Sequence, residues 1–265
     1  MTKLHWGTNC IDCAEGLKLL KSNSIDLTIT SPPYDNLRKY NGYSFDFETT
    51  AKELYRVTKE GGIIVWIVGD ATIKGSETGT SFKQALYFMD CGFKLHDTMI
   101  YEKNSSSFPA KHGSNRCTQI FEYMFVFCKG KIRSDISVLC DKKNKWAGYT
   151  NWGNNTQYNK DGELIQTNNI KPIPEYSPRT NIWKYSVGFN DKTGHPAVFP
   201  EQLAQDHILC WSKEGDIVLD CFSGSGTTHK MALLNNRRFI GFEISQEYID
   251  METKRLKDCG LWRYD

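Results

Sequence analysis

Apolar residues along the chain follow two patterns, the alternation typical of strands and the wider spacing typical of amphipathic helices. The stretch IDLTITSPPY begins at Ile25 with apolar and polar residues in alternation and ends with two prolines and a tyrosine. Two prolines cannot continue a β-ladder or form a helix interior, so this strand must end in a stiff turn. The continuous apolar run IIVWIV at 63–68 is typical of a strand covered on both faces.

The same patterns predict the other elements. Helices are expected at 45–59, where Gly61 and Gly62 end the helix, and at 82–89, 201–211, 246–257 and from Thr227. Further strands are expected at 95–101, 123–127, 217–220 and 239–242. Strands that alternate with helices indicate an α/β fold with a mostly parallel sheet. Between residues 142 and 176 the periodicity disappears, which indicates an insert in this fold.

Composition indicates the general class of protein. The 265 residues, 39% hydrophobic and 24% charged, are typical of one large globular domain or of one domain with an insert. No apolar run approaches the roughly 18 residues that span a bilayer, and the first residues do not resemble a signal peptide, so a cytoplasmic protein is expected. The nine cysteines then predict reduced thiols. Cys10 and Cys13 form a lone C-x-x-C without a second pair nearby, so we expect buried thiols and no metal site.

Charge is unevenly distributed. Residues 103–190 contain 13 Lys and Arg and 6 Asp and Glu, a net charge of +7, whereas the whole chain has +2 and the remainder therefore −5. A solvated loop would explain this segment, and so would a polyanionic partner.

The sequence VLDCFSGSGTT, residues 218–228, runs from a predicted strand through a loop into a helix. Gly224 and Gly226 allow the backbone to approach a ligand closely, and the helix beginning at Thr227 and Thr228 presents unpaired N–H groups. Glu243 follows 17 residues after Gly226, at the end of the next strand, where an acid can accept hydrogen bonds from ribose. This pattern predicts a nucleoside cofactor. A P-loop is excluded because Gly-Lys-Ser/Thr is missing, whereas a dinucleotide dehydrogenase and a turn without a ligand stay open.

Together, TSPPY at 30–34 and DCFSGSGTT at 220–228 resemble the DNA amino-methyltransferases, which transfer a methyl group from S-adenosylmethionine to the exocyclic nitrogen of adenine or cytosine. Three further segments match in the order of the permuted β group of this family: DCAEGLKLL from Asp12, HPAVFPEQLAQDHI from His195 and GFEISQEYI from Gly241. The resemblance covers nearly the whole chain. It implies a Rossmann-like methyltransferase fold with a catalytic half at 1–130, a target-recognition insert at 131–190 and a cofactor-binding half at 191–265.

The family's catalytic motif, Asp/Asn/Ser-Pro-Pro-Tyr/Phe, is matched by Ser31-Pro32-Pro33-Tyr34. An exocyclic amino nitrogen is a poor nucleophile, so its hydrogens must be held by acceptors that favour a tetrahedral nitrogen. The resemblance implies the Ser31 side chain and the Pro32 carbonyl as acceptors, with Pro33 fixing the direction of that carbonyl. Tyr34 would stack on a base flipped out of the duplex, and the methyl group would pass directly in line to nitrogen.

The resemblance also implies the cofactor site. Its residues are Asp12, His195, Pro196, Phe199, Asp220, Phe222, Gly224, Gly226, Thr227, Thr228 and Glu243. Asp12 contacts the cofactor or target base, or is simply a helix N-cap, and Phe222 packs on the cofactor or belongs to the core. Asp220 orients the cofactor's amino group or the loop backbone. His195 is expected as a hydrogen-bonding wall residue rather than a base, and Asp70 is a weaker candidate at another strand end.

In the insert, Lys142, Lys143, Lys145 and Arg179, together with Lys171 and Lys184, are expected to bind the phosphates of double-stranded DNA. Asn, Gln, Trp and Tyr lie among them and could read or stack on bases. The alternative is a polar loop whose aromatic residues pack on the core. A cognate restriction endonuclease is a further possible partner, and the enzyme is expected to be a monomer or a homodimer.

The sequence leaves two candidates for the target base, cytosine and adenine. A Ser before Pro-Pro, with HPAVFP at 195–200, resembles the cytosine-N4 branch more than the adenine-N6 branch, which stays the alternative. Three other classes are weaker: a protein-glutamine methyltransferase, an NAD-dependent oxidoreductase and a non-catalytic DNA-binding protein.

Overall fold

The computed structural model describes residues 5–33, 45–106, 109–150, 155–167, 171–186 and 199–261. The chain forms two compact units, one of Met1–Ser137 with Asn181–Asp265 and one of Val138–Thr180.

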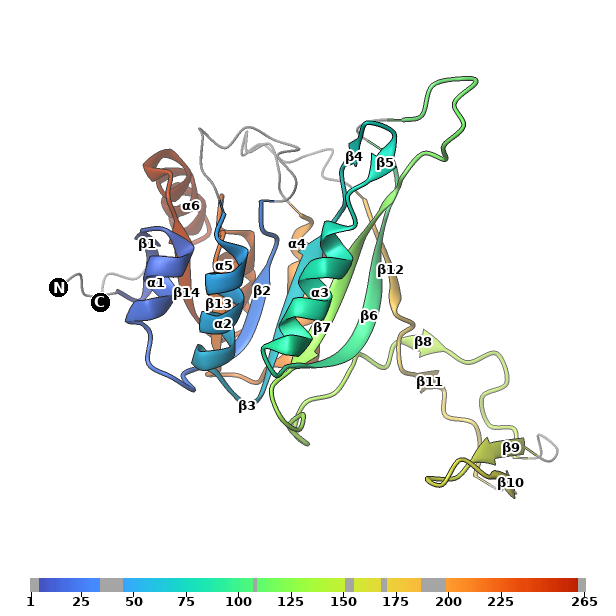
Figure 1. The fold of residues 1–265 in the computed structure, drawn as a ribbon. Helices are drawn as coiled ribbons and strands as arrows, with labels where there is room; N and C mark the ends of the chain where they lie inside the picture. Colours follow the sequence, from blue (N-terminus) through green and yellow to red (C-terminus); the bar gives the residue numbers. More distant parts are fainter. Residues whose placement is uncertain are drawn as a thin grey trace. The chain divides into compact units, whose positions relative to one another are not determined.

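The first unit is built on an eight-stranded sheet with the order β1-β14-β13-β2-β3-β7-β6-β12 (Figure 1). Its strands are β1 (Gly7–Cys10), β2 (Ile25–Thr30), β3 (Thr58–Val68), β6 (Lys94–Lys103), β7 (Phe121–Cys128), β12 (Ile182–Tyr185), β13 (Ile217–Asp220) and β14 (Arg238–Glu243). Neighbouring strands are parallel except where β7 pairs with β3 and β6. The prediction of an α/β fold with a mostly parallel sheet is confirmed.

Helices cover both faces of the sheet (Figure 1). One row is α1 (Cys13–Leu19), α2 (Phe47–Val57) and α3 (Thr80–Asp90), and the other is α4 (Glu201–Trp211), α5 (Thr227–Leu234) and α6 (Gln246–Asp258). Within the described residues, none of these helices is long and apolar enough to cross a membrane. Alternating strands and helices thus bring the carboxyl ends of β2, β3, β13 and β14 to one edge of the sheet.

The core under α2 and α3 is aromatic. Trp66 of β3 is fully buried, with its ring 4.9 Å from that of Phe88 in α3. Its indole N–H donates to the Gln84 side chain at 2.8 Å, so the polar edge of this large ring keeps a partner inside the core.

The alternation in β2 does not mark a solvent-exposed face, because all six of its residues are buried. Asp26 accepts hydrogen bonds from Lys59 Nζ at 2.8 Å and from the Ile217 backbone N–H at 2.9 Å. Thr30 donates to the Asp220 carboxylate at 2.7 Å. Two polar positions of this central strand, Asp26 and Thr30, therefore make specific contacts to its neighbours.

The helix expected at 45–59 is shorter, and the strand after it is longer. α2 ends at Val57, and Thr58 opens β3, where its hydroxyl donates to the Leu54 carbonyl at 2.7 Å. Gly61 and Gly62 lie inside β3, so the expectation that they end the helix is wrong. A Cβ on Gly62 would lie 3.1 Å from the Asp26 carbonyl oxygen, so glycine allows β3 to lie close against β2 here.

The expectation of two buried thiols in C-x-x-C is half right. Cys13 is buried at the start of α1, whereas Cys10 is exposed at the end of β1. Among the described residues, no group of three or more His, Cys, Asp and Glu is arranged to hold a metal ion.

The second unit contains two short antiparallel pairs. β8 (Lys142–Lys143) pairs with β11 (Tyr176–Ser177), and β9 (Asn155–Tyr158) pairs with β10 (Leu164–Thr167). Strands this short have too few positions for a detectable alternation. The segment 131–190 expected as the insert also includes β12, which belongs to the sheet of the first unit.

Asp26→Ala should lower the free energy of unfolding by about 3 kcal/mol, because it leaves the Lys59 ammonium and the Ile217 N–H without their buried acceptor. Urea denaturation measures this loss. The control is Asp258→Ala, which removes a 62% exposed partner of Lys254 and should cost less than about 1 kcal/mol. Equal losses in the two variants would contradict the role given to Asp26.

Candidate active site

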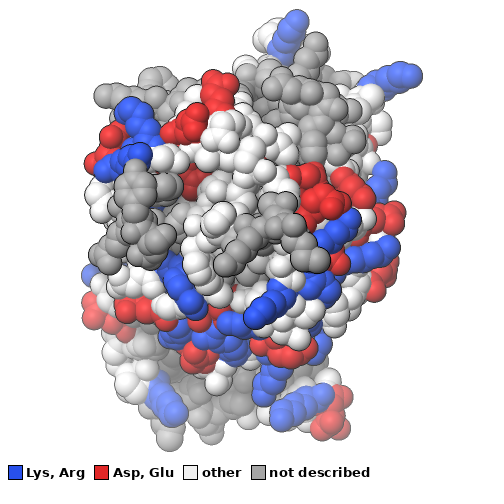
Figure 2. Space-filling view, turned by 90° about the vertical axis from the view of Figure 1, so that its left-hand side faces the viewer, with Lys and Arg blue, Asp and Glu red and all other residues white. Residues whose placement is uncertain are grey.

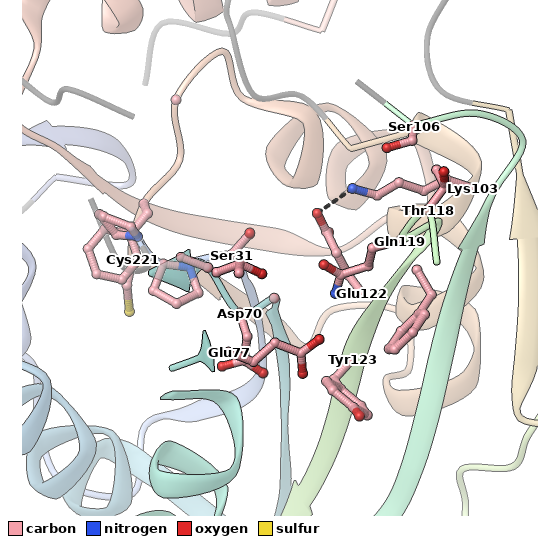
Figure 3. A pocket seen from close by; sticks show the side chains of 18 of the residues that line it. Ser31, Asp70, Glu77, Lys103, Ser106, Thr118, Gln119, Glu122, Tyr123 and Cys221 are labelled. Atoms are coloured by element: carbon pink, nitrogen blue, oxygen red, sulfur yellow. Dashed lines mark hydrogen bonds and ion pairs between the residues drawn. The ribbon is translucent and has the colours of Figure 1, made fainter. Parts of the chain in front are cut away.

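A cavity of about 850 Å³ opens at the carboxyl edge of the sheet in the first unit (Figure 3). Its walls include Ser31, Pro32 and Pro33 after β2, residues 69–72 after β3, Cys221, Phe222 and Gly224 after β13, and residues 242–244 at the end of β14. Crevices outside the carboxyl ends of parallel strands are the usual ligand sites of such folds. The cavity is therefore the first candidate for the active site.

The catalytic and glycine-loop segments meet because β2 and β13 are neighbours. Leu27 pairs with Val218 and Thr28 with Leu219, so both strands end at the same edge. Ser31 and Gly224 consequently line one cavity. The prediction that these two strand ends come together is confirmed. Tyr34 lies outside the described residues.

Asp220 lies beneath the cavity and is not among the residues that line it. Its carboxylate is 2% exposed and accepts hydrogen bonds from the Thr30 hydroxyl and, at 3.1 Å, from the Phe222 backbone N–H. Burial raises the pKa of this carboxyl, against the opposing effects of His229 and of these hydrogen bonds. Of the two roles expected for Asp220, the structure shows contact with the loop backbone.

Glu243 holds the glycine loop from the cavity side. Its carboxylate accepts hydrogen bonds from the Gly224 N–H at 3.0 Å and from the Ser245 N–H at 2.9 Å. Gly224 has φ +50°, so the loop turns sharply at this contact. Burial raises the pKa of Glu243, and the backbone donors oppose that rise. The carboxylate lines the cavity with acceptor capacity left for a ligand.

Gly226 is required for packing rather than for an approach to the cavity. It has φ +75°, and a Cβ there would lie 2.3 Å from Glu252 Cγ in α6. Thr227 and Thr228 begin α5 and are buried, and Arg255 donates to the Thr227 hydroxyl at 3.0 Å. Gly226 and Thr227 thus lie against α6, and none of the three residues lines the cavity.

The remaining residues predicted to bind the cofactor lie in different surroundings. Asp12 is the N-cap of α1 and accepts from the Ala14 N–H at 2.8 Å, so the structure shows the N-cap role. Phe222 lines the cavity, and its ring packs edge-on against Phe45 at 5.0 Å. Phe199 is half-buried before α4 and is not part of the cavity wall. His195 and Pro196 lie outside the described residues.

One wall of the cavity, at the end of β6 and the start of β7, was not predicted from the sequence. Lys103 donates to the Glu122 carboxylate at 2.5 Å, and Tyr123 lies beside this pair in the cavity (Figure 3). A lone acid in the apolar strand FEYMFVFC was the signal for Glu122. Asp70, rated a weaker candidate, also lines the cavity, and its carboxylate accepts from the Ser81 N–H at 2.9 Å.

The cations predicted to bind DNA differ in their surroundings. Lys142 and Lys143 are exposed on β8, and Lys145 lies over the Trp146 ring at 5.2 Å. Arg179 forms a two-pronged ion pair with Asp141, whose pKa it lowers. Lys184 pairs with Glu102 in the first unit. On the face in Figure 2, basic and acidic side chains lie among one another.

Comparisons with known proteins agree with this geometry. The family model described as DNA methylase, N6_N4_Mtase, matches residues 25–254. The chain is 58% identical over 241 residues to the orphan methyltransferase M.BamHII of Bacillus amyloliquefaciens, and the match covers 89% of each protein.

Two solved structures share the fold. The PvuII DNA methyltransferase, described as cytosine-N4-specific, has a TM-score of 0.67 and 22% sequence identity to this chain. The superposition covers 96% of this chain and 87% of the PvuII enzyme. A putative DNA modification methylase of Thermus thermophilus, complexed with S-adenosyl-L-methionine, has a TM-score of 0.63 and 20% sequence identity. This superposition covers 96% of this chain and 94% of the Thermus protein. The fold is therefore the Rossmann-like fold of DNA methyltransferases.

Gly226→Ala should lower the free energy of unfolding by at least about 2 kcal/mol more than Gly215→Ala. Both glycines have a left-handed backbone, at φ +75° and +81°, but an added Cβ at Gly215 would meet no atom within 4 Å. Denaturant unfolding of the two variants separates backbone strain from the collision with Glu252. Similar losses would show that the approach of α6 does not require a glycine here.

Proposed function

This chain belongs to the N6/N4 family of DNA methylases, and we propose that it methylates N4 of cytosine in double-stranded DNA. The methyl donor is S-adenosyl-L-methionine, and the transfer is direct and in line. N6 of adenine is the alternative target. One observation carries the proposal: Ser31-Pro32-Pro33 and the Gly224–Glu243 contact line one cavity.

The described residues fit this cofactor. Glu243 offers a carboxylate to ribose hydroxyls, and Gly224 exposes backbone without a side chain. The Phe222 and Tyr248 rings line the same part of the cavity and suit the adenine ring. When bound, S-adenosyl-L-methionine supplies a methyl group on a positively charged sulfur.

The residues after β2 act on the amino group. The Ser31 hydroxyl and the Pro32 carbonyl accept its hydrogens and favour a nitrogen whose lone pair points away from the ring. Because two prolines fix φ at consecutive positions, these acceptors are held in place before the substrate binds. The chain therefore contributes mainly by positioning.

Cytosine is favoured by the residue before Pro-Pro. Ser31 occupies this position, and the PvuII enzyme that shares the fold is described as cytosine-N4-specific. The target base must leave the duplex, since its amino group cannot reach a cofactor at the bottom of the cavity while it is stacked.

Double-stranded DNA is the partner that this reaction needs. The exposed Lys142, Lys143 and Lys145 in the second unit supply charges for its phosphates. Arg179 would have to leave Asp141 in order to take part. A cognate restriction endonuclease stays a prediction.

Incubation with duplex DNA and labelled S-adenosyl-L-methionine, followed by nucleoside analysis, should give N4-methylcytosine. N6-methyladenine as the labelled product would establish the alternative, and DNA without label would refute the proposed activity. Modification-aware sequencing of the same DNA gives the recognition site.

Two variants should separate the effect on methyl transfer from the effect on cofactor binding. Ser31→Ala should lower kcat about 100-fold and leave the Kd for cofactor nearly unchanged, because it removes one acceptor at the reacting nitrogen. Glu243→Ala should instead raise the Kd for cofactor about 10-fold or more, since an ionised acceptor is lost. Calorimetric titration with S-adenosylhomocysteine and steady-state kinetics measure the two effects. The assignment of roles fails if both variants lose only affinity for DNA.

Cofactor affinity should fall with decreasing pH, beginning at a higher pH than an ordinary glutamate would give. Burial raises the pKa of Glu243, so its carboxylate takes up a proton earlier as the pH falls and loses acceptor capacity. Kd measured by calorimetry between pH 8 and pH 5 tests this. Glu243→Gln should bind more weakly at pH 8 but vary less over the same range, and an equally steep dependence in that variant would assign it to another group.

A further inference from the structure

Arg255 of α6 holds the glycine loop from the side opposite to Glu243. Its guanidinium donates to the Ser225 carbonyl at 3.1 Å and to the Thr227 hydroxyl at 3.0 Å. The side chain is 14% exposed, and Ser225 and Thr227 are buried. Arg255 therefore contacts the last residues of the loop and the first turn of α5 from inside the fold.

The same guanidinium reaches α4. Its second terminal nitrogen donates to Glu201 Oε1 at 2.5 Å, and Lys230 of α5 donates to the same oxygen at 2.7 Å. Glu201 is the first residue of α4, where a negative charge is also favoured by the helix dipole. Burial would raise the pKa of Glu201, but the hydrogen bonds from Lys230 and Arg255 outweigh it and lower this pKa.

The contacts of Arg255 thus join three segments, the loop after β13, the first turn of α5 and the first turn of α4. Of these, the loop after β13 also lines the candidate cofactor site, through Phe222 and Gly224. We propose that Arg255, acting through Ser225 and Glu201, is a positioning residue that sets the shape of the glycine loop for the cofactor. This inference rests on the proposed function.

The geometry of the loop explains why this contact matters. Glu243 accepts from the N–H of Gly224, and Arg255 donates to the carbonyl of the next residue, Ser225. Both hydrogen bonds are charge-assisted and therefore stronger than those between neutral groups. With a donor and an acceptor of successive residues held from opposite sides, the backbone at Gly224 has little freedom to turn away from the cavity.

An arginine suits this position better than a lysine. Three separate acceptors, on Ser225, Thr227 and Glu201, are met by the planar guanidinium with two of its nitrogens. A lysine ammonium carries the same charge on one nitrogen and cannot span the loop and α4 together. The charge alone is consequently not sufficient for the proposed role.

Arg255→Met should raise the Kd for S-adenosylhomocysteine about 10- to 100-fold, as expected for the loss of charge-assisted hydrogen bonds that preorganise a site. With saturating cofactor, kcat and KM for DNA should change less than threefold. The matched control is Lys254→Met, one residue earlier in α6, whose side chain is 80% exposed and pairs with Asp258; its Kd should equal that of the wild type. Calorimetry, steady-state kinetics and Tm without ligand are measured on each protein.

Arg255→Lys and Glu201→Gln keep the experiment decisive if Arg255→Met fails to fold. Arg255→Lys should bind cofactor with intermediate affinity, and Glu201→Gln should weaken binding in the same direction. The double variant of Glu201→Gln and Arg255→Met gives a further test. If it raises the Kd for S-adenosylhomocysteine by less than the product of the two separate fold-changes, the two residues act as one unit.

The outcomes separate this inference from the proposed function. Wild-type protein that binds no S-adenosylhomocysteine and methylates no DNA refutes the proposed function. Wild-type protein that binds it, with folded Arg255→Met and Arg255→Lys variants of unchanged Kd, refutes the positioning role alone. A lower Tm with wild-type Kd in these variants would make Arg255 only structural and also refute it.

Discussion

The parallel pairing of β13 with β2 is the constraint on which the active site depends. These strands are separated by about 190 residues in the chain, yet Thr30 at the end of one donates directly to Asp220 at the end of the other. Since parallel strands end at the same edge, the segments that follow them must share the space above that edge. Ser31 and Gly224 line one cavity for this reason, although the cofactor half comes last in the chain.

Apolar packing alone would not fix the register of this pair. A shift by two residues would keep Ile25, Leu27 and Ile29 on the same face of the sheet. Polar contacts at both ends oppose such a shift: Asp26 accepts from the Ile217 N–H at one end, and Thr30 meets Asp220 at the other. The side chains of Asp26, Thr30 and Asp220 are buried, and a shift would leave them without these partners, which is costly. Polar residues inside the sheet therefore define where the cavity forms.

Short continuous motifs were predictable from the sequence because their function needs neighbouring residues. The end of β2 before Pro32 and the strand–loop–helix order around Gly224 are of this kind. Features that depend on distant contacts were not predictable. The collision that reserves position 226 for glycine involves Glu252 in α6, and the Lys103–Glu122 wall requires β6 and β7 to pair. The helix boundary at Thr58 also has a distant contact: Lys129, the residue after β7, donates to the Thr58 carbonyl.

Two charged groups hold the glycine loop, and one of them, Glu243, lies in the wall of the cavity. The other is Arg255 of α6, whose guanidinium donates to the Ser225 carbonyl. Glu243 has a raised pKa and loses its charge first. Acid thus removes an acceptor from the cavity while the loop stays attached to α5, α6 and, through Glu201, α4. The loop is thus held by two groups, the guanidinium of Arg255 from α6 and the titratable carboxylate of Glu243 in the cavity wall.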